Sequence, residues 1–195
     1  MFIELTDHLR CPTDHPEQYL VLLPHRMEGR RVVGGELGCP VCGRVVRVDH
    51  GIADFGDAAP SDGKTSLSAD ALAALMGLSG PGGYVALAGG VTSLASGLAA
   101  LLPGVRLVLV NPPVGIEDAE TGSVIRAERL PLKSASMRGV AIGADLAPIP
   151  AWITDAARAV LPGLRVVGEG GAPPVTGMEV LGKAGDVWVG KSVGR

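Results

Sequence analysis

The chain has 195 residues, a formal net charge of −3, and 47% hydrophobic but only 3% aromatic residues. This composition excludes a disordered chain and predicts a globular protein with a core of Val, Leu, Ile and Ala. Residues 1–58 hold six basic and nine acidic side chains, and in the remainder the two kinds are equal in number. Neither part has the basic surface that generic nucleic-acid binding requires, so we expect no such binding.

The sequence also lacks the signals of export and of a membrane span. The segment from Met1 to Glu4 has neither the basic nor the apolar region of a secretory signal. The longest apolar stretch, residues 84–102, is interrupted by glycines and hydroxyl residues, which predicts a strand, a turn and a helix. Three cysteines in metal-type spacing indicate a reducing compartment, so we expect a cytoplasmic protein.

All three cysteines and all four histidines lie within the first 50 residues. This distribution predicts two parts of different construction: a zinc ribbon at residues 1–58 and an apolar α/β domain at residues 67–195. Residues 59–66, in a polar stretch rich in turn-forming residues, are predicted to be the linker. A module as small as the first part is marginally stable alone, and a metal would stabilise it.

The first part is predicted to consist of short strands. A strand or turn at residues 2–7 leads to the first candidate ligands, and residues 49–55 close the module. Between them, apolar or alternating runs predict strands at residues 19–23, at 30–33 with 35–37, and at 44–48.

Four side chains of this part have the spacing of a tetrahedral zinc site. Cys39 and Cys42 come from one Cys-Pro-Val-Cys-Gly turn, and Cys11 supplies a third thiolate. The fourth ligand is most simply His15, with Asp14 as the alternative. A site closed by four protein ligands is structural rather than catalytic. The competing interpretation is three free cysteines with a redox or packing role.

Residues 1–55 resemble a family of short zinc ribbons. The resemblance is carried by Leu9-Arg-Cys-Pro12, Gly38-Cys-Pro-Val-Cys-Gly43 and the closing segment Val46-Arg-Val-Asp-His-Gly-Ile-Ala-Asp-Phe55. The family is the small activator subunit that supports tRNA, ribosomal and release-factor methyltransferases, and the resemblance implies a role near translation. The usual first Cys-x-x-Cys of the family is replaced by Cys11-Pro-Thr-Asp-His15.

The second part is predicted to alternate helices and strands. Its first helix has Ser66 or Ser68 as the N-cap and Leu72, Leu75 and Met76 on one apolar face. Periodicity then predicts helices at residues 93–102 and 151–161, a terminal strand pair at 180–181 and 186–190, and strands at 84–88, 107–110, 124–127, 139–142 and 164–168. This alternation predicts an α/β fold with a doubly wound sheet.

Residues 81–195 resemble a class I, Rossmann-like methyltransferase. Residues 84–95 match the first strand, glycine-rich loop and helix of that family, and Val108-Leu-Val-Asn111 matches the end of its second strand. Residues 128–142 resemble the segment that leads into and forms the fourth strand, and residues 155–167 resemble the next helix, Pro-Gly turn and fifth strand. The resemblance implies S-adenosylmethionine as cofactor, bound by Ala86, Ala88, Gly89, Gly90, Asn111 and Glu128.

Several of these positions depart from the family pattern. Ala86 and Asn111 stand where the family has acidic residues, and Ala88 and Thr92 stand where it has loop glycines. A neutral amide lacks the charge-assisted pairing of a carboxylate with ribose hydroxyls, and added side chains crowd the approach of the backbone to the cofactor. The alternative for Gly89-Gly90 is a strand-to-helix turn without a ligand.

Two acidic residues near the predicted crevice are open to two interpretations. Glu128 would contact the adenine side of a cofactor, or it is an exposed acid beside a turn. Asp145 follows the predicted fourth strand, where this fold places substrate residues, or it is a loop or helix-cap acid.

Two functions remain open from the sequence. The first is a methyltransferase that binds S-adenosylmethionine weakly, with an unknown acceptor and no identified catalytic residue, because residues 67–195 contain no His or Cys. The second is an inactive methyltransferase-fold protein, a pseudoenzyme that acts as a scaffold for a protein partner or a second copy. A dinucleotide-dependent oxidoreductase is disfavoured because Gly89-Gly90-Val-Thr does not supply G-x-G-x-x-G.

Overall fold

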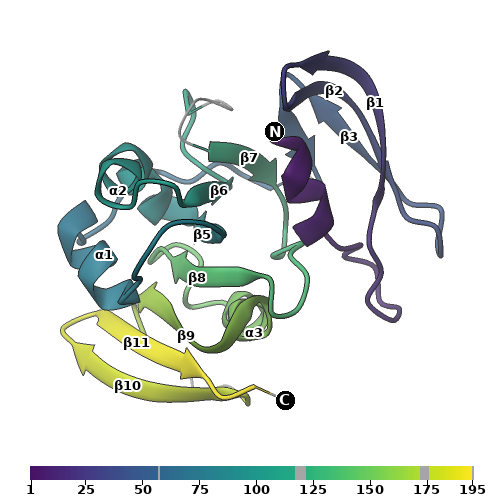
Figure 1. The fold of residues 1–195 in the computed structure, drawn as a ribbon. Coiled ribbons are helices and arrows are strands. Elements are labelled where there is room, and N and C mark those ends of the chain that lie inside the picture. The colour runs from purple at the N-terminus through teal and green to yellow at the C-terminus, as the bar shows by residue number, and fades with distance from the viewer. Residues whose placement is uncertain (57, 117–121, 172–175, 195) are drawn as a thin grey trace.

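The computed structural model describes residues 1–56, 58–116, 122–171 and 176–194 (Figure 1). The first part of the chain contains η1 (Ile3–His8), β1 (Val21–Glu28), β2 (Arg31–Gly38), β3 (Val45–Asp49) and β4 (Ile52–Asp54). The second part contains α1 (Ala69–Met76), β5 (Tyr84–Ala88), η2 (Gly89–Leu94), α2 (Ala95–Leu101), β6 (Arg106–Val110), β7 (Gly122–Arg126), β8 (Met137–Ile142), α3 (Pro150–Ala159), β9 (Val160–Glu169), β10 (Met178–Ala184) and β11 (Val187–Ser192). No helix in the described ranges is long and apolar enough to cross a membrane.

The described strands form one sheet of 11 strands in the order β1-β2-β3-β4-β7-β6-β5-β8-β9-β11-β10. Its centre has the order of a doubly wound fold, because β7, β6, β5, β8 and β9 pair in parallel and are the third, second, first, fourth and fifth strands of the second part. In such sheets, ligands bind beyond the carboxyl ends of the strands where the strand order reverses. Here the reversal lies between β5 and β8.

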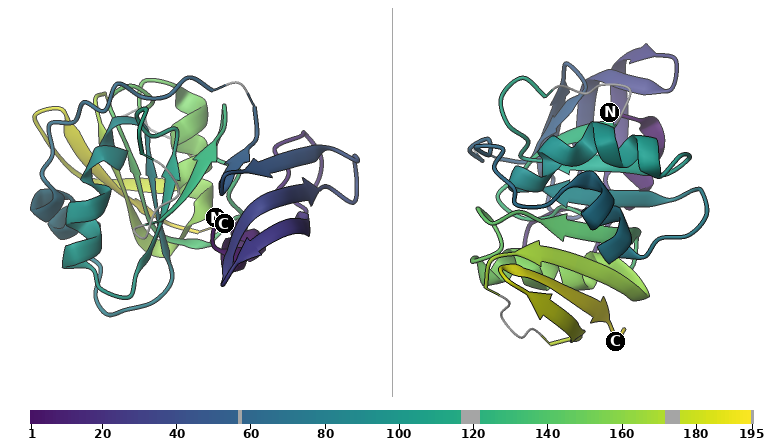
Figure 2. Two further views of the ribbon diagram at one scale, coloured as in Figure 1. Left: turned by 90° about the horizontal axis from the view of Figure 1, so that it is seen from above. Right: turned by 90° about the vertical axis from the view of Figure 1, so that its left-hand side faces the viewer.

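Helices cover both faces of this central sheet. Figure 2 shows α1 and α2 on one face, and α3 on the other face together with the N-terminal module. An antiparallel hairpin completes the sheet, since β11 pairs with β9 and β10 pairs with β11. The predicted fold class, an α/β fold with a doubly wound, Rossmann-like sheet preceded by a small β-rich module, is confirmed. The predicted terminal strand pair is also confirmed, although both strands are longer than expected.

The central strand explains why both faces are apolar. Successive side chains of a strand point to opposite faces. In β5, Val85 and Leu87 pack in the cluster that contains α1 and α2, whereas Ala86 and Ala88 pack in the cluster on the α3 face. All four residues are fully buried, as expected for a parallel strand covered on both sides.

Two helix starts reflect hydroxyl side chains. Ser68 caps α1, since its hydroxyl accepts the N–H of Ala71 at 3.2 Å. The helix predicted from residue 93 begins as α helix only at Ala95. Before it, the hydroxyls of Thr92 and Ser93 donate to carbonyl oxygens three residues back, at 2.6 and 2.8 Å, and η2 takes the tighter 3-10 form.

The N-terminal module consists of antiparallel strands β1 to β4 and the short helix η1. Of the strand or turn predicted at residues 2–7, the strand alternative is wrong, because the tight turns of η1 form there. Thr6 Oγ1 donates to the carbonyl oxygen of Ile3 at 2.7 Å, which supports the tight turn, and Leu5 is fully buried. Only Phe2 keeps strand-like pairing, through an isolated bridge to Arg31.

The module joins the second part through the sheet itself. β4 pairs in parallel with β7, with Ala53 opposite Ile125 and Asp54 opposite Arg126. A single hydrophobic cluster also includes buried residues of both parts, among them Leu5, Leu37, Phe55, Val108 and Ile142. The two parts therefore share a core, and a change in the stability of one is expected to affect the other.

Candidate functional site

Three thiols and one imidazole come together in the N-terminal module. The ligand atoms of Cys11, His15, Cys39 and Cys42 all lie within 4.8 Å of one another. The Sγ atoms of Cys11 and Cys42 are 3.6 Å apart, and His15 Nε2 lies 3.4 Å from Cys39 Sγ. Three sulfurs and one imidazole nitrogen are a donor set of structural zinc sites. The cluster holds the four residues expected from the sequence, and the alternative ligand Asp14 is not part of it.

A tight turn positions two of the sulfurs. The N–H of Gly43 donates to the carbonyl oxygen of Cys39 at 3.0 Å, and the N–H of Cys39 donates to that of Arg44 at 2.8 Å. Gly43 has a φ of +71°, a left-handed conformation that glycine adopts without a steric penalty. The turn thereby brings Cys39 and Cys42 to the cluster from one short segment.

The His15 ring is oriented by the next residue. Nδ1 lies 2.7 Å from the carbonyl oxygen of Pro16, which can only accept, so Nδ1 carries a proton and Nε2 is left for a metal. A hydrogen bond from the second ring nitrogen is usual for histidine ligands. The same carbonyl raises the pKa of His15, because it stabilises the protonated ring.

The Cys42 thiol has an environment that favours ionisation. It is exposed, and its pKa is lowered to about 6, chiefly because the backbone N–H of Arg44 donates to the sulfur, with further contributions from the Thr13 hydroxyl and the other thiols. Metals bind the thiolate rather than the thiol. The donor set, its spacing and this hydrogen bonding all fit a zinc ion.

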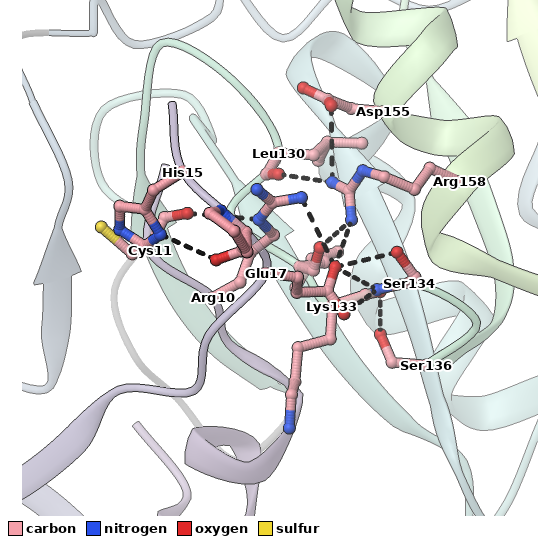
Figure 3. Close-up of polar contacts among 12 residues, drawn as sticks. Arg10, Cys11, His15, Glu17, Leu130, Lys133, Ser134, Ser136, Asp155 and Arg158 are labelled. Carbon is pink, nitrogen blue, oxygen red and sulfur yellow. Dashed lines mark hydrogen bonds and ion pairs between the residues drawn. The ribbon is translucent and has the colours of Figure 1, made fainter. Parts of the chain in front are cut away.

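A carboxylate ties the segment after the metal ligands to the second part of the chain (Figure 3). Glu17 accepts hydrogen bonds from the N–H and the hydroxyl of Ser134 at 3.0 and 2.8 Å. Arg10 and Arg158 each pair with the same carboxylate at 3.4 Å. Burial opposes ionisation of Glu17, but the Ser134 and arginine contacts prevail and lower its pKa.

A cavity of about 680 Å³ lies beside this network, between α3 and the C-terminal residues. Its cationic lining consists of Arg10, Arg129 and Arg158. Arg129 makes two hydrogen bonds to Asp155, at 3.0 and 3.2 Å, and the other two arginines pair with Glu17. The volume suits a small ligand, but the charges are already matched within the protein. None of the residues predicted to bind the cofactor lines this cavity.

The predicted cofactor loop lies at the carboxyl end of β5. Ala86 and Ala88 are packed in the core on the α3 face. Gly89 follows with a φ of +71°, which glycine tolerates. The N–H of Gly90 donates to the Asp145 carboxylate at 3.1 Å. Asp145 comes directly after β8, so its carboxylate occupies the loop at the point where the strand order reverses.

Asn111 is engaged with the backbone of a neighbouring segment. Its Nδ2 donates to the carbonyl oxygen of Ala127 at 2.7 Å, and its Oδ1 accepts the N–H of Ala127 at 2.9 Å. The residue is 4% exposed and has a φ of +53°, a conformation that asparagine tolerates better than most residues. Both polar atoms of the side chain are therefore used inside the protein. Glu128, the remaining predicted cofactor residue, is exposed and lies beside Gly56.

Residues 58–66, named here the crossing segment, run over the carboxyl ends of three strands. At β6, the N–H of Ser61 donates to the carbonyl oxygen of Asn111 at 3.2 Å. At β5, the carbonyl oxygen of Lys64 lies so close to Gly90 that a Cβ on this glycine would overlap it. At β9, the N–H and hydroxyl of Ser66 donate to Glu169 Oε1 at 2.6 and 2.7 Å.

These contacts were not predictable from the sequence. A polar, aperiodic segment gives no pattern that indicates where it packs, and Glu169 was not among the candidate site residues. The one available signal was the glycine at position 90, because close backbone approach is a general reason for glycine at such a turn.

The carboxyl ends of β5, β6 and β8 together form the place where this fold binds a ligand, called the crevice below. The residues at this crevice fit S-adenosylmethionine poorly. The amide of Asn111 is occupied, the N–H of Gly90 is bonded to Asp145, and the Lys64 carbonyl covers the loop. A ligand in this place would have to displace the crossing segment.

No protein-family model and no curated protein sequence matches the chain. Solved structures with a similar fold include the antibiotic-resistance methyltransferase Kmr, with 12% identity, a TM-score of 0.44, and coverage of 70% of this chain and 98% of Kmr. Another is the geranyl diphosphate C-methyltransferase from Streptomyces coelicolor A3(2), with 15% identity, a TM-score of 0.43, and coverage of 51% of this chain and 41% of that chain. A third is the T. thermophilus 16S rRNA N2 G1207 methyltransferase RsmC, with 18% identity, a TM-score of 0.38, and coverage of 88% and 43%.

The chain thus spans less than half the length of the last two proteins. The class of the fold follows from its own strand order: a doubly wound, Rossmann-like α/β fold with a β-rich N-terminal module and a cysteine-histidine cluster that could hold zinc.

Proposed function

We propose that the chain is a zinc-binding protein of methyltransferase-like fold that does not bind S-adenosylmethionine tightly, because its own crossing segment fills the cofactor crevice. The contact of the Lys64 carbonyl with Gly90 carries this proposal. In this fold, the glycine loop accepts a cofactor because its backbone is accessible. Here another part of the backbone already occupies that position.

Charge and space at the crevice support the same conclusion. The methionine carboxylate of the cofactor would compete with Asp145 for the N–H of Gly90 and would be repelled by it. A hollow of about 220 Å³ lies beside the crossing segment, lined by Pro60, Asn111 and Pro113 among others. This volume is below the roughly 300–1,000 Å³ of ordinary ligand pockets.

A non-catalytic role requires a partner, and we infer a protein partner. The supporting observation is an apolar surface on the outer face of the N-terminal module. Val21, Leu23 and Val45 lie on one face of β1 and β3, and their exposures are 52%, 60% and 54%. Light scattering of the protein and of Leu23→Lys tests for a second copy as this partner: a dimer that Leu23→Lys dissociates supports it. A monomer would exclude self-association, and the partner would then be a different protein.

The second candidate is a methyltransferase that binds its cofactor weakly after the crossing segment moves. The observation in its favour is the retained backbone of the loop, with glycines at positions 89 and 90 and a left-handed φ at Gly89. In this case zinc would remain structural, and the methyl acceptor would be unknown.

Calorimetric titration of the zinc-loaded protein with S-adenosylmethionine and S-adenosylhomocysteine separates the two candidates. The first predicts no binding up to millimolar ligand, with circular dichroism and a cooperative melt showing a folded protein. Micromolar binding would overturn it and establish the second. Elemental analysis of the same sample tests the zinc, with one equivalent per chain expected.

A further inference from the structure

We propose that the crossing segment is a displaceable plug, that Glu169 is the latch that holds it, and that its release opens the crevice to a ligand of the nucleoside class. The inference rests on the proposed function, because it explains how the closed crevice is kept closed. Three features carry it: how the segment is attached, how Glu169 is bonded, and which groups face the crevice.

The crossing segment is attached in a manner that permits release. It contains no helix or strand, and its residues alternate between half-buried and exposed, with Ser61, Gly63 and Thr65 half-buried and Asp62 and Lys64 exposed. Its hydrogen bonds to strand ends in the described residues are those at Asn111 and at Glu169. The segment is therefore held at its two ends and lies over the glycine loop between them.

Glu169 is buried, with 2% exposure, at the carboxyl end of β9. Its Oε1 accepts both hydrogen bonds from Ser66, at 2.6 and 2.7 Å. Its Oε2 is buried and has no hydrogen-bond partner within the described ranges. A buried carboxylate oxygen without a donor is costly, so the closed state holds the plug strongly at one oxygen and leaves the other unsatisfied. A ligand that supplied further donors would satisfy Glu169 better than the plug does.

The groups around the crevice define the ligand chemistry. Glu169 is the last residue of β9, Asp145 follows β8, and Glu128 follows β7, so three carboxylates lie at this edge of the sheet. Carboxylates accept hydrogen bonds from hydroxyl and amino groups and repel phosphates. A nucleoside supplies such donors from its sugar and its base. The plug itself imitates them with the hydroxyl and N–H of Ser66.

Trypsin reports release of the plug without any ligand, because it cleaves after Lys64, whose side chain is exposed within the segment. The test compares Glu169→Ala and Ser66→Ala with two matched controls at exposed positions, Glu179→Gln on β10 and Ser96→Ala on α2. Mass spectrometry follows the cleavage after Lys64. Losing hydrogen bonds to a charged group should speed this cleavage about tenfold in Glu169→Ala and less in Ser66→Ala, with the controls unchanged.

Equilibrium dialysis then measures binding of S-adenosylhomocysteine and of adenosine to the same proteins. We expect Ser66→Ala, which weakens the plug and keeps the Glu169 carboxylate for the ligand, to bind at least one of these probes about threefold more tightly than the wild type. Faster cleavage without a gain in binding would overturn the assignment of the crevice as a ligand site. Unchanged cleavage would overturn the latch.

The design remains decisive if Glu169→Ala does not fold, because Ser66→Ala keeps the buried carboxylate, must show faster cleavage after Lys64, and carries the binding measurement. The two proposals also fail separately. Tight binding of S-adenosylmethionine by the wild type would overturn the proposed function, whereas the rate of cleavage after Lys64 tests the latch whatever the wild type binds.

Discussion

Glu17 and Ser134 join the metal-binding segment to the second part of the chain, since the N–H and the hydroxyl of Ser134 both donate to the Glu17 carboxylate. Glu17 lies two residues beyond His15, a candidate metal ligand. The position of this carboxylate therefore depends on the conformation that a metal would impose on residues 11–15. A metal here would stabilise both the N-terminal module and its contact with the rest of the molecule.

The first prediction concerns this contact. Glu17→Ala removes the acceptor of Ser134 and the partner of Arg158, so we expect the free energy of unfolding to fall by about 1–3 kcal/mol. Ser134→Ala should cost less, because its N–H remains. A double-mutant cycle in denaturant should give a coupling of at least about 0.5 kcal/mol, and strict additivity would contradict a direct interaction.

The second prediction concerns the metal ligands. His15→Gln should lower the zinc content measured by elemental analysis and the midpoint of thermal unfolding, because the donor set loses its nitrogen. His25→Gln is the matched control, since His25 is exposed and lies outside the cluster. Equal zinc content in both variants would show that His15 is not a ligand. Chelation of the wild type should destabilise the whole molecule, because both parts share one hydrophobic cluster.

The third prediction separates a structural role of Asn111 from cofactor binding. Asp at this position cannot donate to the Ala127 carbonyl, so Asn111→Asp should lower the free energy of unfolding by about 1–3 kcal/mol. It should not create binding of S-adenosylmethionine, although it restores the acidic residue of the family pattern. A variant that is as stable as the wild type and binds the cofactor would contradict this account.

The fourth prediction is a pH dependence of stability. Burial lowers the pKa of His8 below its ordinary value of 6.5, with a smaller lowering by Lys133 and an opposing effect of Asp7. Its ring centroid lies 4.6 Å from that of Tyr84, so an aromatic ring covers one side of the imidazole. Above pH 6.5 the ring is neutral in both states, and this contribution to stability is complete. As the pH falls below 6.5, the unfolded chain binds the proton first, and the free energy of unfolding decreases.

His8→Gln should remove that part of the decrease. The measurement is the free energy of unfolding across this pH range for wild type and variant, both with excess zinc, because acid also weakens metal binding. His25→Gln should keep the wild-type profile. Parallel profiles for wild type and His8→Gln would show that His8 does not contribute.

Much of the fold was predictable from local sequence patterns. The uninterrupted apolar runs at residues 84–88 and 107–110 indicated buried parallel strands, and both form, as β5 and β6. Ser68 was an identifiable N-cap. The four residues of the metal cluster were indicated by residue type and spacing, because tight turns bring ligands together locally.

The contacts between distant segments were not predictable in the same way. Nothing in the sequence near Asn111 indicates that its amide pairs with the backbone of Ala127, since that pairing depends on the arrangement of β6 and β7. The same holds for Ser66 and Glu169, which are 103 residues apart. The family resemblance pointed to the carboxyl end of β5 as a cofactor site but gave no sign that the chain itself crosses it.

Hydrogen exchange of the wild-type protein tests the central claim, that the crossing segment fills the crevice, most directly. The N–H groups of Ser61 and Ser66 donate to Asn111 and Glu169, and the N–H of Gly90 donates to Asp145 beneath the segment. We predict that all three exchange much more slowly than in an unstructured peptide. Exchange of Ser61 and Ser66 at the unstructured rate, with β5 still protected, would contradict the claim and leave the crevice open to a cofactor.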